Sequence, residues 1–305
     1  MEATAVEVEP DREGERLDRF LAEGLGISRA RVRHLLEVGR ISHAGGALEL
    51  SDKSRKTAVG ERYEVSGSLR AEDERPASRS DLELRVVAEG IGWLVVDKPA
   101  GLGVHPLRPD QDDTVLNAVI ARYPEIAGVG EGGLRSGVVH RLDVGTSGAL
   151  AFATDEVLWK RLRGAFSEHR VQKRYVALVS GRFETARRVD LSLGVTRHSP
   201  AHVGVVEGGY ACRQRVEPLE IFRDATLVAV RLETGFLHQI RATMAHVGHP
   251  IVGDAEYADS DVASPVEAPR PMLHAMHLSV DEIRVEVPIP DDMEAVLAKL
   301  RAATD

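Results

Sequence analysis

The sequence predicts an α+β fold in which helices flank a mixed, largely antiparallel central sheet, preceded by a small α/β unit. Short apolar runs and helical patterns both occur after residue 80 without regular alternation, which disfavours a doubly wound parallel sheet. Residues 68–80 lack any apolar run and carry mixed charges, serine and proline, as linkers do. Since 305 residues suffice for about two domains, we expect a small unit over 14–67, a linker over 68–80 and a larger domain over 81–305.

The small unit shows two helical patterns followed by short strand-like pieces. The first combines apolar residues at helical spacing with two glycines that end it: Leu17, Phe20, Leu21, Gly24 and Gly26. The second has a serine N-cap, an apolar stripe and a glycine stop: Ser28, Val32, Leu35, Leu36 and Gly39. Residues 1–12 are acidic and have no clear period, so we expect them to be frayed.

The larger domain contains both types of element. Four apolar runs predict strands, over 91–99, 148–154, 174–181 and 225–233. Three segments with apolar residues at helical spacing predict helices, over 114–123, 155–169 and 238–248. This mixture favours a sheet with flanking helices over an all-helical or all-strand domain.

Composition excludes several classes of protein. No stretch approaches the ~20 apolar residues that a membrane span needs. The N-terminal residues are acidic and lack the positive and apolar segments of a secretory signal. Because Cys212 is the only cysteine, no disulfide can form within the chain, and we expect a cytoplasmic protein without membrane contact.

A basic patch lies in the small unit, although the net charge of −9 by itself gives no sign of a nucleic-acid partner. The patch comprises Arg29, Arg31, Arg33, Arg40, Lys53, Arg55 and Lys56. Helical spacing places Arg29 and Arg33 on one face, largely away from the apolar stripe. Such a patch is typical of a phosphate-binding surface or of a solvated helix face.

The segment HRLDVGTSGALAFA, residues 140–153, carries the most chemical information. On an extended segment, Arg141 and Asp143 project to the same face. A carboxylate in this position can act as a nucleophile, a general base or a metal ligand, or it can simply cap a turn.

Three weaker patterns compete with this segment. GVGEGG at 128–133 fits a dinucleotide-binding spacing, but no clear strand precedes it and no helix follows, so we interpret it as a flexible loop. His238, His246 and His249 have no cysteine nearby, so packed or hydrogen-bonded histidines are a simpler interpretation than a zinc site. Ser147 lacks the G-x-S-x-G context of a nucleophile elbow, and the second acid of a glycosidase is missing from these motifs.

Ordered motifs make 81–305 resemble the RluA-type RNA pseudouridine synthases and their fold. The matching stretches are DKPAGLGVHP (97–106), HRLDVGTSG (140–148), QKRYVALVSG (172–181), TGFLHQIRATMAHVGHPIVGDAEY (234–257) and PMLHAMHL (271–278). The small unit resembles the alpha-L RNA-binding domain of ribosomal small-subunit protein four, through its RLD helix, its SRARVRHLLEVG core and its final GERYEV strand. The second resemblance implies binding to structured RNA.

The first resemblance implies roles for individual residues. Asp143 would be the nucleophile, Tyr175 would lie over the target base and help remove the proton from carbon five, and Arg241 would pair with the nucleophilic carboxylate. Arg141 would help take the target uridine out of its stack. We expect further residues of the motifs to contact the substrate: His140, Thr146, Ser147, His105, His238 and Gln239. The basic patch of the small unit would contact RNA.

The implied reaction detaches uracil from ribose, rotates it and rejoins it through carbon five. It needs no redox step and no activated phosphate, so we expect neither a cofactor nor a metal. The carboxylate can attack the anomeric carbon or carbon six, or abstract a sugar proton, and a nearby guanidinium keeps it ionised. Extrusion of the base costs a few kcal/mol, and stacking on an aromatic ring returns ~1–3 kcal/mol.

Four positions depart from the family's motifs, and two functions follow from the resemblance. Phe236, Leu237, Thr243 and His277 stand where the family usually has arginine, a small polar residue, histidine and arginine. These changes remove positive charge near the expected RNA path. We expect a monomeric enzyme that acts on ribosomal RNA, most of all of the large subunit, or on a pre-ribosomal particle, with transfer RNA as the other class of substrate. The alternative is an inactive RNA-binding or ribosome-assembly protein, which the intact Asp143, Tyr175 and Arg241 disfavour.

Overall fold

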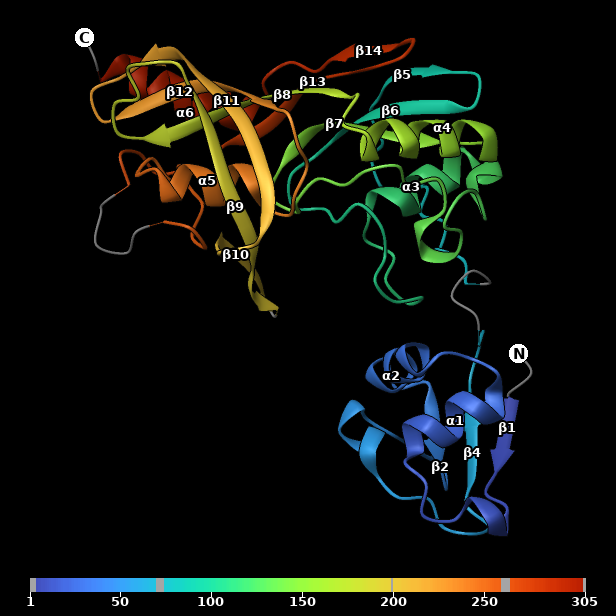
Figure 1. Ribbon diagram of the computed structural model, residues 1–305. Coiled ribbons are helices and arrows are strands. Elements are labelled where there is room, and N and C mark those ends of the chain that lie inside the picture. Colours follow the sequence, from blue (N-terminus) through green and yellow to red (C-terminus); the bar gives the residue numbers. More distant parts are fainter. Residues whose placement is uncertain (1–3, 70–73, 199, 259–263, 304–305) are drawn as a thin grey trace.

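The computed structural model describes residues 4–69, 74–198, 200–258 and 264–303. Within these residues the chain forms a four-stranded sheet near the N-terminus and a ten-stranded sheet in the larger domain (Figure 1). The larger sheet is mixed and mostly antiparallel, and helices flank it, so the predicted fold class is confirmed.

The small unit packs two helices against its four-stranded sheet. Its elements are β1 (Thr4–Glu7), η1 (Pro10–Arg12), α1 (Leu17–Leu25), α2 (Arg29–Glu37), β2 (Ile41–His43), β3 (Gly46–Ala47), η2 (Leu50–Ser54) and β4 (Arg62–Val65). Gly26 ends α1 with a φ of 65°, and the Ser28 hydroxyl caps α2 by accepting from the Arg31 amide, as predicted. The expectation of a frayed N-terminus was wrong, because β1 pairs along its length with β4.

The predicted linker is held at both of its ends. Glu74 is buried and binds the guanidinium groups of Arg31 and Arg40 in the small unit. On the other side, the Asn117 side-chain amide of the larger domain donates to the Ala77 carbonyl at 2.8 Å. Residues 70–73 lie outside the described part of the chain.

The larger sheet runs in the order β10-β9-β11-β12-β8-β13-β7-β6-β5, with β14 paired to β13. Among its described pairs only β13 and β7 run parallel. The strands are β5 (Val86–Gly90), β6 (Trp93–Lys98), β7 (Ser147–Ala153), β8 (Gln172–Ser180), β9 (Arg187–His198), β10 (Ala201–Val205), β11 (Tyr210–Ile221), β12 (Ala225–Leu232), β13 (Leu273–Val280) and β14 (Ile283–Glu286). The four predicted strands correspond to β6, β7, β8 and β12.

Helices bury both faces of the central strands. On β7, Leu150 and Phe152 pack in the same cluster as α3 (Val115–Arg122) and α5 (Gln239–His246). The alternate residues Ala149 and Ala151 pack in the same cluster as α4 (Glu156–Ser167). Because both faces are covered, these strands have continuous apolar runs instead of alternation. The fourth helix, α6 (Asp291–Ala302), packs in a separate cluster with β8, and no described helix is long and apolar enough to cross a membrane.

Candidate active site

Asp143 lies in the loop that leads into β7, at the wall of a small pocket. Its carboxylate is 24% exposed, so it is accessible without being fully solvated. The Thr146 amide donates to the Asp143 carbonyl at 3.0 Å and closes a turn behind the carboxylate. Below this turn the buried Lys98 ammonium donates to the Val144 carbonyl at 3.1 Å and to the carbonyls of Pro99 and Leu102. Lys98 therefore holds the loop that carries Asp143, and the Asp143 carboxylate lines the pocket.

The Arg241 guanidinium from α5 lies beside this carboxylate, with its Nη1 3.5 Å from Asp143 Oδ2. Asp254 accepts from Nε at 2.6 Å and from Nη2 at 2.8 Å, and Glu256 accepts from Nη2 at 2.8 Å. Burial opposes the charge of Arg241, but the Asp254, Asp143 and Glu256 carboxylates together raise its pKa above the ordinary value. The guanidinium is thus permanently charged, and two acids orient it so that Nη1 faces Asp143.

Tyr175 on β8 lines the same pocket as Asp143 and Arg241. Burial, and then the charge of Asp143, raise the pKa of Tyr175 above the ordinary value of a phenol. Its hydroxyl therefore stays protonated at neutral pH. The pocket is lined by Arg141, Leu142, Asp143, Thr146, Tyr175, Leu232, Phe236, His238, Gln239, Ile240, Arg241 and Leu273.

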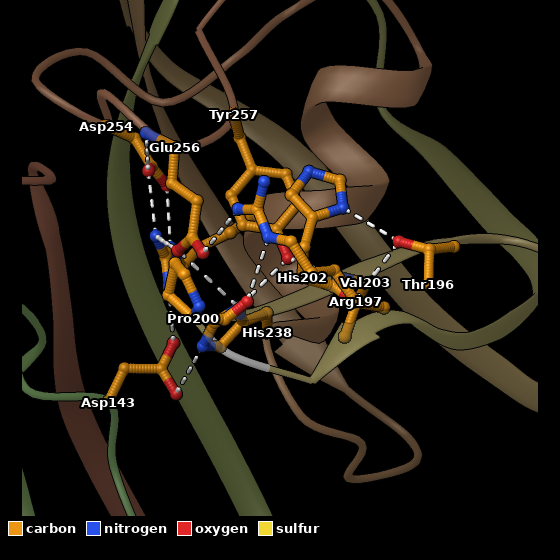
Figure 2. Close-up of polar contacts among 11 residues, drawn as sticks. Asp143, Thr196, Arg197, Pro200, His202, Val203, His238, Asp254, Glu256 and Tyr257 are labelled. Atoms are coloured by element: carbon orange, nitrogen blue, oxygen red, sulfur yellow. Dashed lines mark hydrogen bonds and ion pairs between the residues drawn. The ribbon is translucent and has the colours of Figure 1, made fainter.

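His238 is oriented by a neighbouring phenol, as Figure 2 shows. The Val203 amide donates to the Tyr257 hydroxyl oxygen at 2.8 Å, and the only described acceptor for the hydroxyl proton is His238 Nδ1 at 2.9 Å. This arrangement leaves the proton of a neutral imidazole on Nε2, which lies 3.9 Å from Asp143 Oδ1. Burial lowers the pKa of His238, which favours the neutral ring.

Comparison with known proteins identifies the family to which a chain with this site belongs. The sequence model of a family described as RNA pseudouridylate synthase matches residues 92–246. The chain belongs to this family. A relative from Chloroflexus aurantiacus, described as an uncharacterized RNA pseudouridine synthase, is 35% identical over 98% of this chain and 94% of its own. The resemblance to RluA-type synthases is thereby confirmed, and the protein is an RNA pseudouridine synthase, an isomerase.

Two further relatives support the same family and fold. A Pseudomonas aeruginosa protein named ribosomal large subunit pseudouridine synthase D is 34% identical over 97% of this chain and 95% of its own. The solved structure of human RNA pseudouridylate synthase domain containing 1 matches with a TM-score of 0.55 and 26% identity. That match covers 73% of this chain and 96% of the human one.

Three of the residues expected at the substrate line the pocket of the synthase but differ in their exposure: Arg141, Thr146 and Gln239. Arg141 is exposed, whereas Thr146 and Gln239 are buried. The side-chain oxygen of Gln239 accepts from the Phe236 amide at 3.1 Å and from the Thr234 hydroxyl at 3.0 Å. Gln239 therefore shapes the turn before α5.

Three residues that we expected at the substrate lie outside the pocket lining of the synthase. His140 stacks on Phe166 with ring centroids 4.5 Å apart, its Nε2 accepts from the Ala151 amide, and burial lowers its pKa to about 3. Ser147 contacts His274 Nδ1 through its hydroxyl at 2.9 Å, and Arg270 donates to the same oxygen. His105 is buried, with its Nδ1 3.0 Å from the Pro106 carbonyl. These three side chains make contacts within the framework around the pocket.

The residues of the basic patch of the small unit fall into a buried group and an accessible group in the structure. Arg31 and Arg40 were expected to be open to RNA, but their side chains are only 10% and 14% exposed. Both bind Glu74 and a backbone carbonyl of the linker, so they hold the linker against the small unit instead of facing solvent. Arg29 is half-exposed and pairs at 2.7 Å with the buried Asp18.

The rest of the patch lies around Asp18 and η2. Arg33 is half-exposed at 3.7 Å from Asp18, Arg55 pairs with Glu61, and Lys53 and Lys56 are partly or fully exposed. Burial opposes the charge of Asp18, but Arg16 and Arg29 lower its pKa to about 2. The accessible charge therefore consists of Arg29, Arg33, Lys53 and Lys56, with Arg55 partly neutralised.

The residues that hold the side chains of the site in position were not identified from the sequence. Lys98, Asp254, Glu256, Tyr257 and Arg270 received no role, although all but the last lie in the matched stretches. The segment GDAEY, residues 253–257, did carry a signal. It places two acids and a tyrosine soon after the helix that contains Arg241, and carboxylates in that position are suited to orienting the guanidinium. Arg270 had no such signal, since its partners Asp292 and Ser147 come from distant segments.

Proposed function

We propose that this synthase isomerises specific uridines in structured large-subunit ribosomal RNA, with Asp143 as the nucleophile and the target uridine flipped out of its helix. Two relatives named ribosomal large subunit pseudouridine synthase D, from Pseudomonas aeruginosa and Vibrio parahaemolyticus, support the substrate class. They are 34% and 32% identical to this chain over nearly its whole length. We further propose a cytoplasmic monomer.

The observation that carries this proposal is the 3.5 Å ion pair between Asp143 and Arg241 in a pocket that Tyr175 also lines. Attack on the anomeric carbon, attack on carbon six and abstraction of a sugar proton all begin with an ionised carboxylate. Arg241 pairs with this carboxylate and fixes its direction, because Asp254 and Glu256 hold the guanidinium in turn. Pre-orientation of this kind removes reorganisation from the chemical step.

Two side chains suit the flipped uridine. Extrusion from a stacked helix costs a few kcal/mol, and contact with an aromatic ring returns ~1–3 kcal/mol per base. Tyr175 offers such a ring beside Asp143, and the exposed Arg141 can fill the space that the base leaves. Because the Tyr175 phenol stays protonated in the free enzyme, its help in removing the carbon-five proton requires that it pass on its own proton.

The small unit supplies a second contact with RNA in this proposal. Arg29, Arg33, Lys53 and Lys56 are the accessible cations of its basic patch, and they lie on α2 and around η2. Contacts between such side chains and phosphates position a protein without reading sequence. The pocket of the larger domain would then select the uridine.

The test is modification of in vitro transcribed large-subunit ribosomal RNA, mapped with a carbodiimide that marks pseudouridine. Wild type should modify one or a few uridines, and Asp143→Asn, which keeps the size of the side chain, should bind the RNA but modify none. Asp224→Asn, at an exposed turn, serves as the matched control and should act like wild type. Full modification by Asp143→Asn would refute the nucleophile, and modification of transfer RNA alone would refute the substrate class.

A further inference from the structure

We propose that Tyr210 and Phe236 form a stacking site for the nucleobase next to the flipped uridine. The inference rests on the proposed function, and it adds a second base-binding position outside the catalytic pocket. Phe236 lines that pocket together with Asp143. The Tyr210 ring stacks on Phe236, with centroids 5.0 Å apart and planes inclined by 29°. The two stacked rings thus form a continuous aromatic surface from the pocket wall to the outside of the protein.

Tyr210 is unusually exposed for a stacked aromatic residue, at 71%. One face of its ring packs on Phe236, so the exposed area belongs to the other face and the edge. Isolated apolar residues on a surface need no explanation, but a rigid ring that another ring orients at the edge of an active site is suited to binding a flat ligand.

The strand pattern explains why this ring is uncovered. On β11, Tyr210 shares a sheet face with Cys212, two residues further on, and its cross-strand partner on β9 is Leu193. Cys212 and Leu193 are buried in one cluster with Ala242 of α5. The face that α5 covers at Cys212 is therefore open at Tyr210, where β11 begins.

A nucleobase is the occupant that the surroundings favour. The target uridine must enter the pocket that Phe236 lines, so the nucleotides next to it in the RNA pass directly over the two rings. A cation for their phosphates is near, because Arg141 is exposed at the same pocket. Stacking on an aromatic ring tolerates any base, because every base has a π-face.

The first experiment compares steady-state kinetics of the full-length enzyme on large-subunit ribosomal RNA transcribed in vitro. Tyr210→Ala should raise KM about 5-fold to 150-fold, the equivalent of ~1–3 kcal/mol for one lost stack, with little change in kcat. Tyr210→Phe keeps the ring and should behave like wild type. Leu219→Ala, at another exposed apolar position of β11, is the matched control and should leave KM unchanged.

The second experiment identifies the stacked base. Short synthetic RNAs that span the mapped uridine would carry an abasic residue on its 5′ or its 3′ side. With one of these RNAs, wild type and Tyr210→Ala should have equal KM values, because the partner of the ring is gone. A Tyr210→Ala penalty that persists with both RNAs would overturn the proposal, as would an unchanged KM of Tyr210→Ala on the transcript.

Failure of the proposed function gives a different result. If wild type leaves the ribosomal RNA unmodified, the substrate assignment fails and the stacking site fails with it. If wild type modifies the RNA and Tyr210→Ala does so with the same KM, only the stacking site fails. Circular dichroism of each variant identifies misfolding, and retention of activity by Tyr210→Phe shows that the position tolerates substitution.

Discussion

Individual side chains in this protein act mainly by holding other side chains in place. Arg241 contacts Asp143, but its direction is set by Asp254 and Glu256, which occupy its Nε and Nη2. His238 similarly takes its orientation from Tyr257. The direction of the Asp143 carboxylate therefore depends on a second layer of residues, and if Asp143 is the nucleophile as proposed, their substitution should alter the rate of reaction more than the binding of RNA.

Asp254→Asn tests this second layer. The amide keeps the shape but removes the charge opposite Arg241 Nε, so the guanidinium loses its preferred direction. We expect kcat to fall about tenfold or more, or ~1.4 kcal/mol, with KM for RNA nearly unchanged. Single-turnover kinetics provide the measurement, and Glu286→Gln, which affects the exposed Arg174–Glu286 pair, is the control. An unaltered rate would show that Asp254 does not orient Arg241.

Lys98 gives the stability of the protein a specific pH dependence. Burial lowers its pKa from 10.5 to about 7, although the nearby Asp143 opposes the shift. Between these values the unfolded chain binds a proton that the folded chain has released, so the free energy of unfolding rises with pH across this window. The cost of charging Lys98 is fully present below about pH 7 and absent above about 10.5.

Urea unfolding of wild type and Lys98→Met from pH 6 to pH 10 measures this effect. The stability of wild type relative to the variant should increase with pH, by on the order of a few kcal/mol in total. The variant removes the titrating group, and the difference between the two proteins cancels the contribution of all other groups. A pH-independent difference would contradict the lowered pKa.

At the level of elements, the sequence predicted four strands that are buried on both faces and missed β9 and β11, which are buried on one, together with β13, whose histidines interrupt its apolar run. β6, β7, β8 and β12 are continuous apolar runs, which are easily recognised. β9 and β11 alternate buried and charged residues, and their many arginines hide the alternation. α6 was missed for a similar reason, because its apolar stripe lies among acids and bases.

Alternation alone does not account for which residues of the HRLD motif reach the pocket. Arg141 and Asp143 both line it, but so does Leu142 between them. His140 instead stacks on Phe166 of α4. The motif alone could not separate these directions. Asp143, Tyr175 and Arg241 are brought together as expected, whereas the partners of Arg31 and Arg40 depend on the distant Glu74 and were not foreseeable.

The buried Gln214 marks an unfavourable point in β11. It is 1% exposed, and neither its side-chain oxygen nor its nitrogen has a hydrogen-bond partner among the described residues. An unpaired buried amide costs about 1–3 kcal/mol. We therefore expect Gln214→Leu to raise the free energy of unfolding by about this amount in urea titration. Gln172→Leu, at an exposed position, should change it by less than ~0.5 kcal/mol, and destabilisation by Gln214→Leu would contradict the prediction.

At the level of the whole molecule, the charge is distributed unevenly. The chain carries 39 lysines and arginines against 48 acids, but residues 14–67 carry ten against eight. The proposed RNA-binding unit is thus mildly basic within an acidic protein. An acidic remainder reduces indiscriminate attraction to RNA, so binding depends on the local cations.

Salt dependence of RNA binding tests this distribution. If Lys53 and Lys56 each contact a phosphate, replacing both with glutamine should reduce the slope of log K against log salt by about two. Affinity should fall similarly for all RNA sequences, because these contacts carry no sequence information. Lys160→Gln, on the exposed side of α4, is the control and should leave the slope unchanged. An unaffected slope in the double variant would exclude phosphate contacts by these two lysines.

The pairing of Glu74 with Arg31 and Arg40 limits how far the small unit and the larger domain can move apart. Because Arg31 and Arg40 hold Glu74 and Asn117 holds Ala77, the chain between the two attachments spans at most about 11 Å. If the small unit binds RNA as proposed, this short connection would restrict modification to uridines at a nearly constant spacing from the bound RNA segment.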